Sequence, residues 1–324
     1  MNIGILATGG IAHKMAKTLS EMNGVTKYAV ASRTEERANA FKEEMGFEKA
    51  YGSYEELCKD QKVELVYIAS PHSEHFENMK LCIKYHKPIL CEKAFCINSK
   101  QAEEVFKLAE EEKVFVAEAM WTRYMPSRRI IDEILNSNIV GDIHLVVANL
   151  GYSIKSHPRL VDPKLGGGSL LDVGVYPITF TQMVYKETPE KVDAHCTYTE
   201  TGVDETDSYT LTYKNNKQAF LYASMDGISD RTGYIYGSKG YIKVININDP
   251  SRIEVYLDQS ETPAKVYPVP EQISGYEYQV EECVDAINKG KLECASMPQK
   301  ESLRMMNIYD EIRSKLNVIY PGEE

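Results

Sequence analysis

The first twelve residues constrain the fold more than any other stretch. Asn2–Leu6 predicts a short apolar strand, and the apolar spacing that follows the turn predicts a helix. A dinucleotide diphosphate requires this strand, tight turn and helix, because small residues admit its phosphates and N–H groups at the helix start face their charge. We therefore predict that the nucleotide is bound by Ala7, Thr8, Gly9, Gly10 and Ile11.

The spacing of this turn fits the dinucleotide pattern G-x-G-x-x-G/A with one departure. Ala7 stands at the first glycine position, Gly9 at the second and Ala12 at the third. Small residues also form ordinary turns, so the pattern alone is a weak signal. Its place between a predicted strand and a predicted helix favours the nucleotide-binding interpretation.

The end of the second predicted strand, Thr26–Ala31, bears on cofactor choice. An NAD-specific fold usually places Asp or Glu here to bind the ribose 2′-hydroxyl, whereas this chain has Ser32 and Arg33. A guanidinium attracts the 2′-phosphate that a carboxylate would repel. We predict NADP(H) rather than NAD(H). A solvated loop arginine is the alternative interpretation of Arg33 taken by itself.

Apolar strands and helices continue to alternate up to about residue 122. This alternation predicts an α/β Rossmann domain over residues 1–122, with a doubly wound parallel sheet. Polar residues that follow two of its strands should lie at the carboxyl edge beside the cofactor. They are Ser70 and Pro71 after one strand, and Glu92 and Lys93 after another.

Residues 123–324 predict a second, α+β domain for substrate binding and dimerisation. Alternating patterns between Lys191 and Pro268 indicate a large, mainly antiparallel open sheet with helices on one face. Its other face carries aromatic residues and is predicted to meet a second copy in a homodimer. The last predicted helix, about 300–316, is a candidate to pack back on the first domain.

A glycine-rich stretch from Gly166 leads into a predicted helix that carries Asp172 and Tyr176. The two residues are four apart, so they share a helix face and can reach one cavity. The alternative is a helix N-terminal acid and a buried tyrosine.

Composition excludes several classes of function. The net charge of −11 argues against nucleic-acid and acidic-membrane partners, and no apolar run approaches the length of a membrane span. The seven cysteines are scattered without a C-x-x-C pair, which predicts reduced thiols in a cytoplasmic protein. The seven histidines show no paired ligand spacing, so no metal site is predicted.

Six segments carry a resemblance to known proteins. Four of them, Ala7–Ala12, Ser70–His75, Glu92–Ala94 and Gly166–Tyr176, together resemble the Gfo/Idh/MocA (glucose–fructose oxidoreductase/inositol dehydrogenase) family over essentially the whole chain. The other two, Glu118–Arg123 and Arg159–Pro163, resemble its branch of dimeric dihydrodiol dehydrogenases and NADP-dependent D-xylose dehydrogenases. Two positions depart from common patterns: Ala94 replaces a proline, and Tyr176 stands where inositol-type members carry histidine.

The resemblance implies roles for particular residues. Lys93 and Tyr176 would form the catalytic pair, and Asp172 would orient Lys93 or bind a substrate hydroxyl. The cofactor site would extend to Ser70, Pro71, His75, Glu92, Lys93, Trp121 and Arg123, and the substrate site would include Trp121, Arg159, Asp172 and Tyr176.

The chemistry of such a pair is consistent with hydride transfer at a carbinol or carbonyl carbon, which also requires a proton to move on or off the oxygen. A nearby ammonium favours the phenolate of a tyrosine, whose pKa is otherwise about 10. The sequence leaves open whether Lys93 or Tyr176 transfers the proton. The expected function is NADP(H)-dependent oxidation or reduction of a sugar or cyclic trans-diol. The alternatives are a glycosidase that uses a trapped NAD and a non-catalytic NADP(H) sensor.

Overall fold

The computed structural model describes residues 1–321 and 323. The chain divides into two compact units, Met1–Tyr124 with Gln272–Met306, and Met125–Glu271 with Asn307–Glu324. This division places Gln272–Met306 with the first unit, whereas the sequence analysis assigned the stretch to the second domain. In the part of the chain that the structure describes, no helix is long and apolar enough to cross a bilayer.

The first unit contains a six-stranded parallel sheet in the order β3-β2-β1-β4-β5-β6. This order reverses between β1 and β4, as in a doubly wound dinucleotide-binding fold, and confirms the predicted Rossmann class. The strands are β1 (Asn2–Leu6), β2 (Thr26–Ala31), β3 (Lys49–Tyr51), β4 (Leu65–Ile68), β5 (Ile89–Glu92) and β6 (Val116–Ala119).

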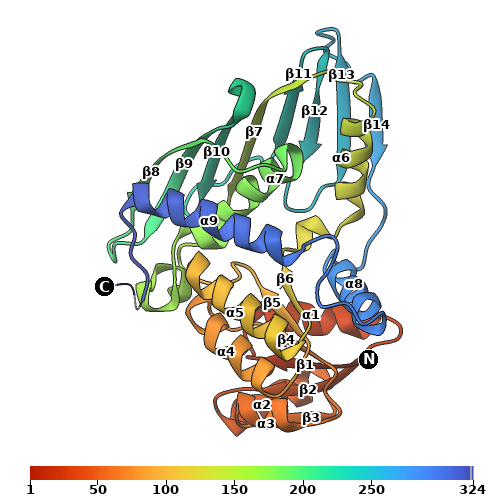
Figure 1. Ribbon diagram of the computed structural model, residues 1–324, viewed down its shortest axis with the longest axis vertical. Helices are drawn as coiled ribbons and strands as arrows, with labels where there is room; N and C mark the ends of the chain where they lie inside the picture. The colour runs from red at the N-terminus through yellow and green to blue at the C-terminus, as the bar shows by residue number, and fades with distance from the viewer. Residues whose placement is uncertain (322, 324) are drawn as a thin grey trace. The chain divides into compact units, whose positions relative to one another are not determined.

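Helices connect these strands and cover the sheet (Figure 1). Helix α1 packs against α2 and α4 packs against α5, so each face of the sheet receives a pair. The helices of this unit up to Arg123 are α1 (Gly10–Glu21), α2 (Glu35–Met45), α3 (Tyr54–Lys59), α4 (His72–Lys84), α5 (Ser99–Glu112) and the 3₁₀ turn η1 (Trp121–Arg123). Helix α8 (Glu277–Asn288) also belongs here, and the division between the units falls within α9 (Gln299–Leu316).

The second unit contains an eight-stranded sheet in the order β14-β13-β12-β11-β7-β10-β9-β8. Neighbouring strands are antiparallel except β7 and β10, which pair in parallel, so the sheet is mainly antiparallel as predicted. The strands are β7 (Ile143–Gly151), β8 (Lys191–Tyr198), β9 (Asp204–Thr212), β10 (Gln218–Ser224), β11 (Gly233–Gly237), β12 (Gly240–Ile245), β13 (Arg252–Leu257) and β14 (Lys265–Pro268).

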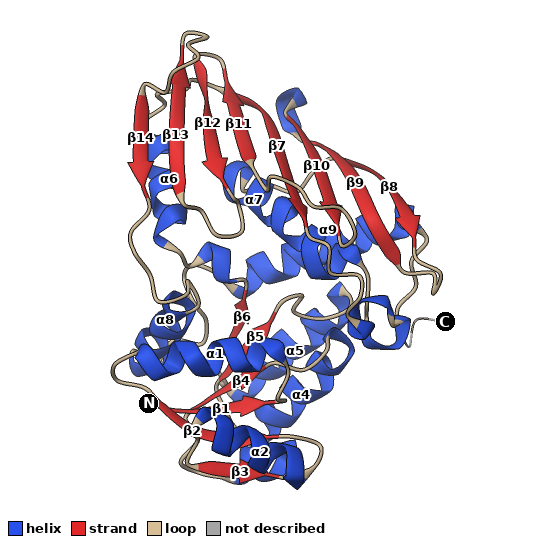
Figure 2. Cartoon of the chain, turned by 180° about the vertical axis from the view of Figure 1, so that it is seen from behind, coloured by secondary structure: helices blue, strands red, loops and turns tan. Residues whose placement is uncertain are grey.

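The two faces of this sheet differ in what covers them. Helices α6 (Pro126–Asn136) and α7 (Val175–Tyr185) lie on one face, and α7 contacts β7, β10 and β11 (Figure 2). Tyr209 and Tyr213 are buried on this covered side. The opposite face carries a row of half-buried tyrosines, and the rings of Tyr241 and Tyr256 stack with centroids 4.6 Å apart.

The stretch predicted as one helix after Gly168 consists of two parts. Leu170–Gly174 forms a π-helical turn, here called the π-turn, and α7 follows it directly. The sequence prediction of a uniform helix is therefore wrong for Leu170–Gly174. Such turns are rare and are set by tertiary contacts, which hydrophobic spacing does not encode.

Candidate active site

The turn after β1 is open to an anion. A Cβ added at Gly9 or Gly10 would meet no atom within 4 Å. Helix α1 begins without a side-chain cap and has no acidic residue in its first turn. No carboxylate of this first turn therefore competes for the initial N–H groups, and the residues present fit a bound diphosphate.

Ala7 adopts the left-handed backbone conformation at this turn, with φ of 77°. Its N–H donates to the Ala31 carbonyl at 2.9 Å, which joins the start of the turn to the end of β2. A side chain in this conformation costs about 1–2 kcal/mol that glycine avoids. The alanine at the first motif position is thus accommodated at an energetic cost.

Replacing Ala7 by glycine should raise the free energy of unfolding by about 0.5–1 kcal/mol, because relief of the left-handed conformation exceeds the added entropy of the unfolded chain. The matched change Ala12→Gly, at a buried position within α1, should lower it by about 1 kcal/mol or more. Urea unfolding of both variants measures the contrast. Destabilisation by Ala7→Gly would contradict the assigned backbone conformation.

Ser32 and Arg33 follow β2 at the same edge. Ser32 is buried and its N–H donates to the Tyr51 carbonyl at 3.1 Å, whereas Arg33 is exposed. Backbone bonding therefore fixes the residue before Arg33, and the guanidinium is accessible to a ligand.

His75 joins the loops that leave β4 and β5. The ring is fully buried, with Nδ1 2.9 Å from the Ala94 carbonyl and Nε2 2.9 Å from the Ser70 carbonyl. Both contacts are hydrogen bonds only when both ring nitrogens carry protons, since carbonyl oxygens only accept. His75 thus has its two ring nitrogens directed at the backbone of this edge, where it fixes the loop that carries Lys93.

A second buried contact supports the Lys93 turn. Tyr67 on β4 donates a hydrogen bond to Glu92, whose carboxylate also accepts from the Lys93 N–H at 3.3 Å. Burial and the charge of Glu92 raise the pKa of Tyr67 well above its usual range, so this phenol stays protonated. The peptide bond between Lys93 and Ala94 is cis.

Trp121 belongs to an aromatic cluster that includes Tyr276, a residue the sequence analysis did not select. The two rings stack with centroids 4.4 Å apart, and the Lys14 ammonium lies 4.4 Å from the Tyr276 centroid. Trp121 is only 3% exposed. Stacking and the cation therefore fix the indole rather than leaving it to move with the loop.

Arg123 and Glu118 mark the end of β6. The Arg123 guanidinium donates to the Ser296 carbonyl at 2.9 Å and pairs with Glu301 at 3.3 Å. Burial raises the pKa of Glu118 to about 7, while the nearby Ser302 hydroxyl and the Arg123 charge act to lower it. Sequence reasoning missed Glu118 as a titrating group, because nothing in its local pattern shows how deeply it is buried.

In the second unit, Asp172 lies on the π-turn and pairs with Arg159, whose Nη2 is 2.8 Å from Oδ1. Tyr176 follows on the first turn of α7 and is 8% exposed. The structure therefore brings together two of the predicted substrate-binding residues, Arg159 and Asp172. Lys93 belongs to the first unit and Tyr176 to the second, so their convergence stays a prediction.

No group of three or more His, Cys, Asp or Glu side chains that could hold a metal ion occurs within residues 1–321 and 323. The side chains described above provide cations, a phenol and carboxylates at a dinucleotide-binding edge and on a π-turn. These are groups that bind phosphates and move protons.

The two-part architecture defines a class of oxidoreductase. Residues 1–120 match the family described as "Oxidoreductase family, NAD-binding Rossmann fold", and residues 129–243 match the "GFO/IDH/MocA C-terminal domain". The chain therefore belongs to the Gfo/Idh/MocA oxidoreductase family, as the sequence analysis predicted.

Curated relatives match over nearly the whole chain. A trans-1,2-dihydrobenzene-1,2-diol dehydrogenase of Xenopus laevis is 35% identical, with 98% of each chain covered. A D-xylose 1-dehydrogenase (NADP(+)) of Hypocrea jecorina is 32% identical over 98% of this chain and 92% of its own.

Solved structures share the fold at lower identity. KijD10, a 3-ketoreductase from Actinomadura kijaniata in complex with NADP and TDP-benzene, superposes with a TM-score of 0.88 at 22% identity, covering 99% of each chain. An aldose-aldose oxidoreductase from Caulobacter crescentus, complexed with glycerol, has a TM-score of 0.88 at 18% identity, with 98% of this chain and 97% of its own covered.

Proposed function

We propose that this protein is an NADP(H)-dependent oxidoreductase that transfers a hydride between the nicotinamide and a carbinol or carbonyl carbon of a sugar or cyclic trans-diol. The observation that carries the proposal is Lys93 at the carboxyl edge of the Rossmann sheet, on a turn supported by Tyr67 and His75. The curated relatives support the substrate class, since they are named as diol and sugar dehydrogenases.

In this proposal the chain's own residues bind and move protons. A bound nicotinamide would supply or accept the hydride. The Tyr176 phenol would exchange a proton with the substrate oxygen, and the Lys93 ammonium would favour the phenolate or polarise that oxygen directly. Asp172, already paired with Arg159, would bind a substrate hydroxyl or orient Lys93. Trp121 and Arg123 would flank the nicotinamide or the substrate.

The test is an NADP⁺-reduction assay with aldoses, polyols and trans-diols, followed by the reverse assay with the corresponding carbonyl compounds. We expect turnover with at least one sugar or trans-diol. Retained, unconsumed cofactor with glycoside cleavage would instead support the NAD-dependent glycosidase alternative. Tight NADP(H) binding without turnover on any compound would support the sensor alternative.

Cofactor choice gives a separate prediction. The variant Arg33→Ala should weaken NADP⁺ binding by about 10- to 100-fold and NAD⁺ binding by less than about 3-fold, because only NADP⁺ presents a 2′-phosphate to the guanidinium. The Kd values of both cofactors, measured by titration calorimetry, give the ratio. Equal losses for the two cofactors would remove the argument for NADP(H) preference.

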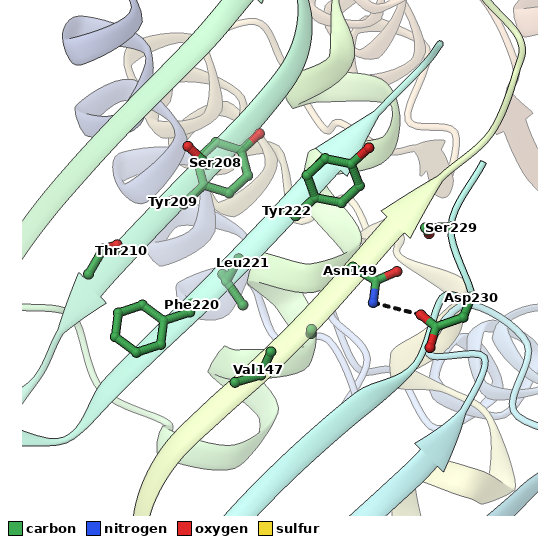
Figure 3. Close-up of a pocket in the computed structure, with 11 residues that line it drawn as sticks. Val147, Asn149, Ser208, Tyr209, Thr210, Phe220, Leu221, Tyr222, Ser229 and Asp230 are labelled. Atoms are coloured by element: carbon green, nitrogen blue, oxygen red, sulfur yellow. Dashed lines mark hydrogen bonds between the residues drawn. The ribbon is translucent and has the colours of Figure 1, made fainter. Parts of the chain in front are cut away.

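We also propose that the protein forms a homodimer through the open face of the eight-stranded sheet. A shallow hollow of about 500 Å³ lies on this sheet, lined by side chains from β7, β9 and β10 and by Asp230, which accepts from Asn149 at 2.8 Å (Figure 3). Phe220 at its edge is 43% exposed, and the stacked Tyr241 and Tyr256 extend the aromatic surface. A second copy presents the same aromatic surface and can cover it by twofold pairing.

Light scattering after gel filtration tests this assembly. Tyr236 on β11 is half-buried and stacks on Tyr234, with ring centroids 5.7 Å apart. We expect a dimer for the wild type and a monomer for the double variant Phe220→Lys with Tyr236→Lys, since two buried ammonium groups in each copy would oppose pairing. A wild-type monomer at micromolar concentration would overturn the assembly proposal.

The thiols of the described residues, six buried and one half-buried, support the proposed cytoplasmic location.

A further inference from the structure

Two buried carboxyl groups on β9, Asp204 and Asp207, have no place in the site described above. Residues three apart on a regular strand point to opposite faces. Here Thr206 pairs with Thr197 of β8 and Asp204 pairs with Tyr198, so Glu205 is an extra residue in the ladder. This β-bulge turns both carboxyl groups to the same buried side, where Asp204 is 0% and Asp207 is 1% exposed.

Asp204 contacts the beginning of the π-turn. Its Oδ2 accepts from the Leu170 N–H. Gly168 lies against the same carboxyl group, and a Cβ there would be 2.2 Å from Asp204 Oδ1. Gly168 also has φ of 123°, which side-chain-bearing residues rarely adopt. The absence of a side chain at Gly168 therefore lets the Asp204 carboxylate reach the buried Leu170 N–H at the start of the turn.

Asp207 supports the end of the same turn through Tyr209. The Tyr209 hydroxyl donates to Asp207 Oδ2 at 2.6 Å. A Cβ at Gly174 would be 2.4 Å from that hydroxyl, so the last residue of the π-turn rests directly on it. The start of the turn thus contacts Asp204 through Leu170, and its end contacts Tyr209, the hydrogen-bond partner of Asp207, through Gly174. Asp172 lies between these ends, and Tyr176 follows two residues later.

The hydrogen bonds leave a proton to be assigned. Within residues 1–321 and 323, Asp204 Oδ1, Asp207 Oδ1 and the Ser169 hydroxyl are buried without a hydrogen-bond partner, and the Ser169 hydroxyl acts to lower the pKa of Asp207. Burial and the negative charge of Asp204 raise the pKa of Asp207 well above its usual range. Burial also raises the pKa of Asp204, but the Leu170 N–H acts to lower it. Asp207 therefore stays protonated, and its O–H can donate a hydrogen bond to the Asp204 carboxylate.

Other titratable groups around the pair favour one negative charge rather than two. Tyr209 on β9, Tyr320 in the C-terminal segment, and Cys196 and Tyr198 on β8 all have raised pKa values and are uncharged at neutral pH. Arg313 acts to lower the pKa of Tyr320; its guanidinium lies over the Tyr320 ring at 4.9 Å and pairs with Asp310 and Glu323.

We propose that Asp204 and Asp207 share one proton and act as positioning residues, holding the π-turn that presents Asp172 and Tyr176 to the substrate. The inference rests on the proposed function, because it takes Asp172 and Tyr176 as active-site groups. Neither aspartate is itself a catalytic residue.

Two substitutions at one position test the positioning role. In Asp207→Asn the amide can donate to Asp204 and accept from Tyr209, so kcat should stay within about 3-fold of wild type. Asp207→Ala removes both bonds and should lower kcat by about 10-fold or more, with the Kd for NADP(H) unchanged within about 3-fold. Equal losses for the two variants, or an unchanged kcat for Asp207→Ala, would overturn the proposal.

Infrared spectroscopy tests the shared proton without requiring turnover. It compares wild type with the isosteric variant Asp207→Asn, so it can be carried out even if Asp207→Ala does not fold. At pH 7.5 the wild type should show the carbonyl stretch of a protonated carboxylic acid that the variant lacks. Any contribution of Glu118 is common to both proteins and cancels in the difference spectrum. No difference would overturn the shared proton. A positive difference in a protein without turnover would overturn the proposed function and leave the carboxyl pair standing.

Discussion

The variant Lys93→Met should have a kcat about 10³-fold lower than wild type, while its Kd for NADP(H) stays within about 3-fold of wild type. Methionine keeps most of the length and the apolar stem of lysine but removes the ammonium. In the proposed mechanism that ammonium acts on the phenol or on the substrate oxygen, so its loss affects the chemical step. In the same proposal the cofactor phosphates would bind at the turn after β1, where a Cβ added at Gly9 or Gly10 would meet no atom within 4 Å. Steady-state kinetics with a substrate from the screen, together with cofactor titration, separates the two effects.

Lys107→Met is the matched control, because Lys107 is exposed on α5 in the same unit. It should retain wild-type kcat and KM. Tyr176→Phe should lose about 10²- to 10⁴-fold of turnover, as expected for removal of a general acid–base group. Full activity of Lys93→Met alongside an inactive Tyr176→Phe would assign proton transfer to the phenol without any role for Lys93.

Glu118→Gln should make the stability of the protein less dependent on pH. The pKa of Glu118 is raised to about 7 by burial, from about 4.3 in an unfolded chain. The native state then binds more protons than the unfolded state between these values, so the stability contributed by protonated Glu118 is complete below pH 4.3 and is lost as pH rises to about 7. The slope is up to about 1.4 kcal/mol per pH unit.

We therefore expect the free energy of unfolding of the variant, relative to that of wild type, to rise by about 2–3 kcal/mol between pH 5 and pH 7, with little further change at pH 8. Urea unfolding at these pH values measures the difference, and Glu110→Gln, at an exposed position on α5, should show none. If the difference in unfolding free energy between Glu118→Gln and wild type stays constant with pH, Glu118 does not titrate in this range.

Local sequence signals predicted the Rossmann half well. Asn2–Leu6 is an apolar strand bounded by small residues, and the structure has β1 over the same residues. The second predicted strand, Thr26–Ala31, likewise has the same bounds as β2. Such features depend on neighbours within a few positions, which a sequence displays directly.

Features made by distant contacts could not be predicted in the same way. The Leu170 N–H of the π-turn donates to Asp204, thirty-four positions further along the chain, and β9 has a bulge opposite Thr197 and Tyr198 beside that residue. The stacking of Tyr276 on Trp121 joins residues in separate parts of the chain. The catalytic pairing of Lys93 and Tyr176 stays a prediction from family resemblance.

The first unit is assembled from two stretches of chain, and this limits how it can be isolated. A fragment ending at Tyr124 would contain all six strands of the Rossmann sheet. It would lack Tyr276, which stacks on Trp121, and Glu301, which forms an ion pair with Arg123. The buried Glu118 would lose its neighbour Ser302 as well. Exchanging nucleotide-binding halves between relatives therefore requires grafting Gln272–Met306 together with the amino-terminal portion, since a single splice leaves these side chains without their native partners.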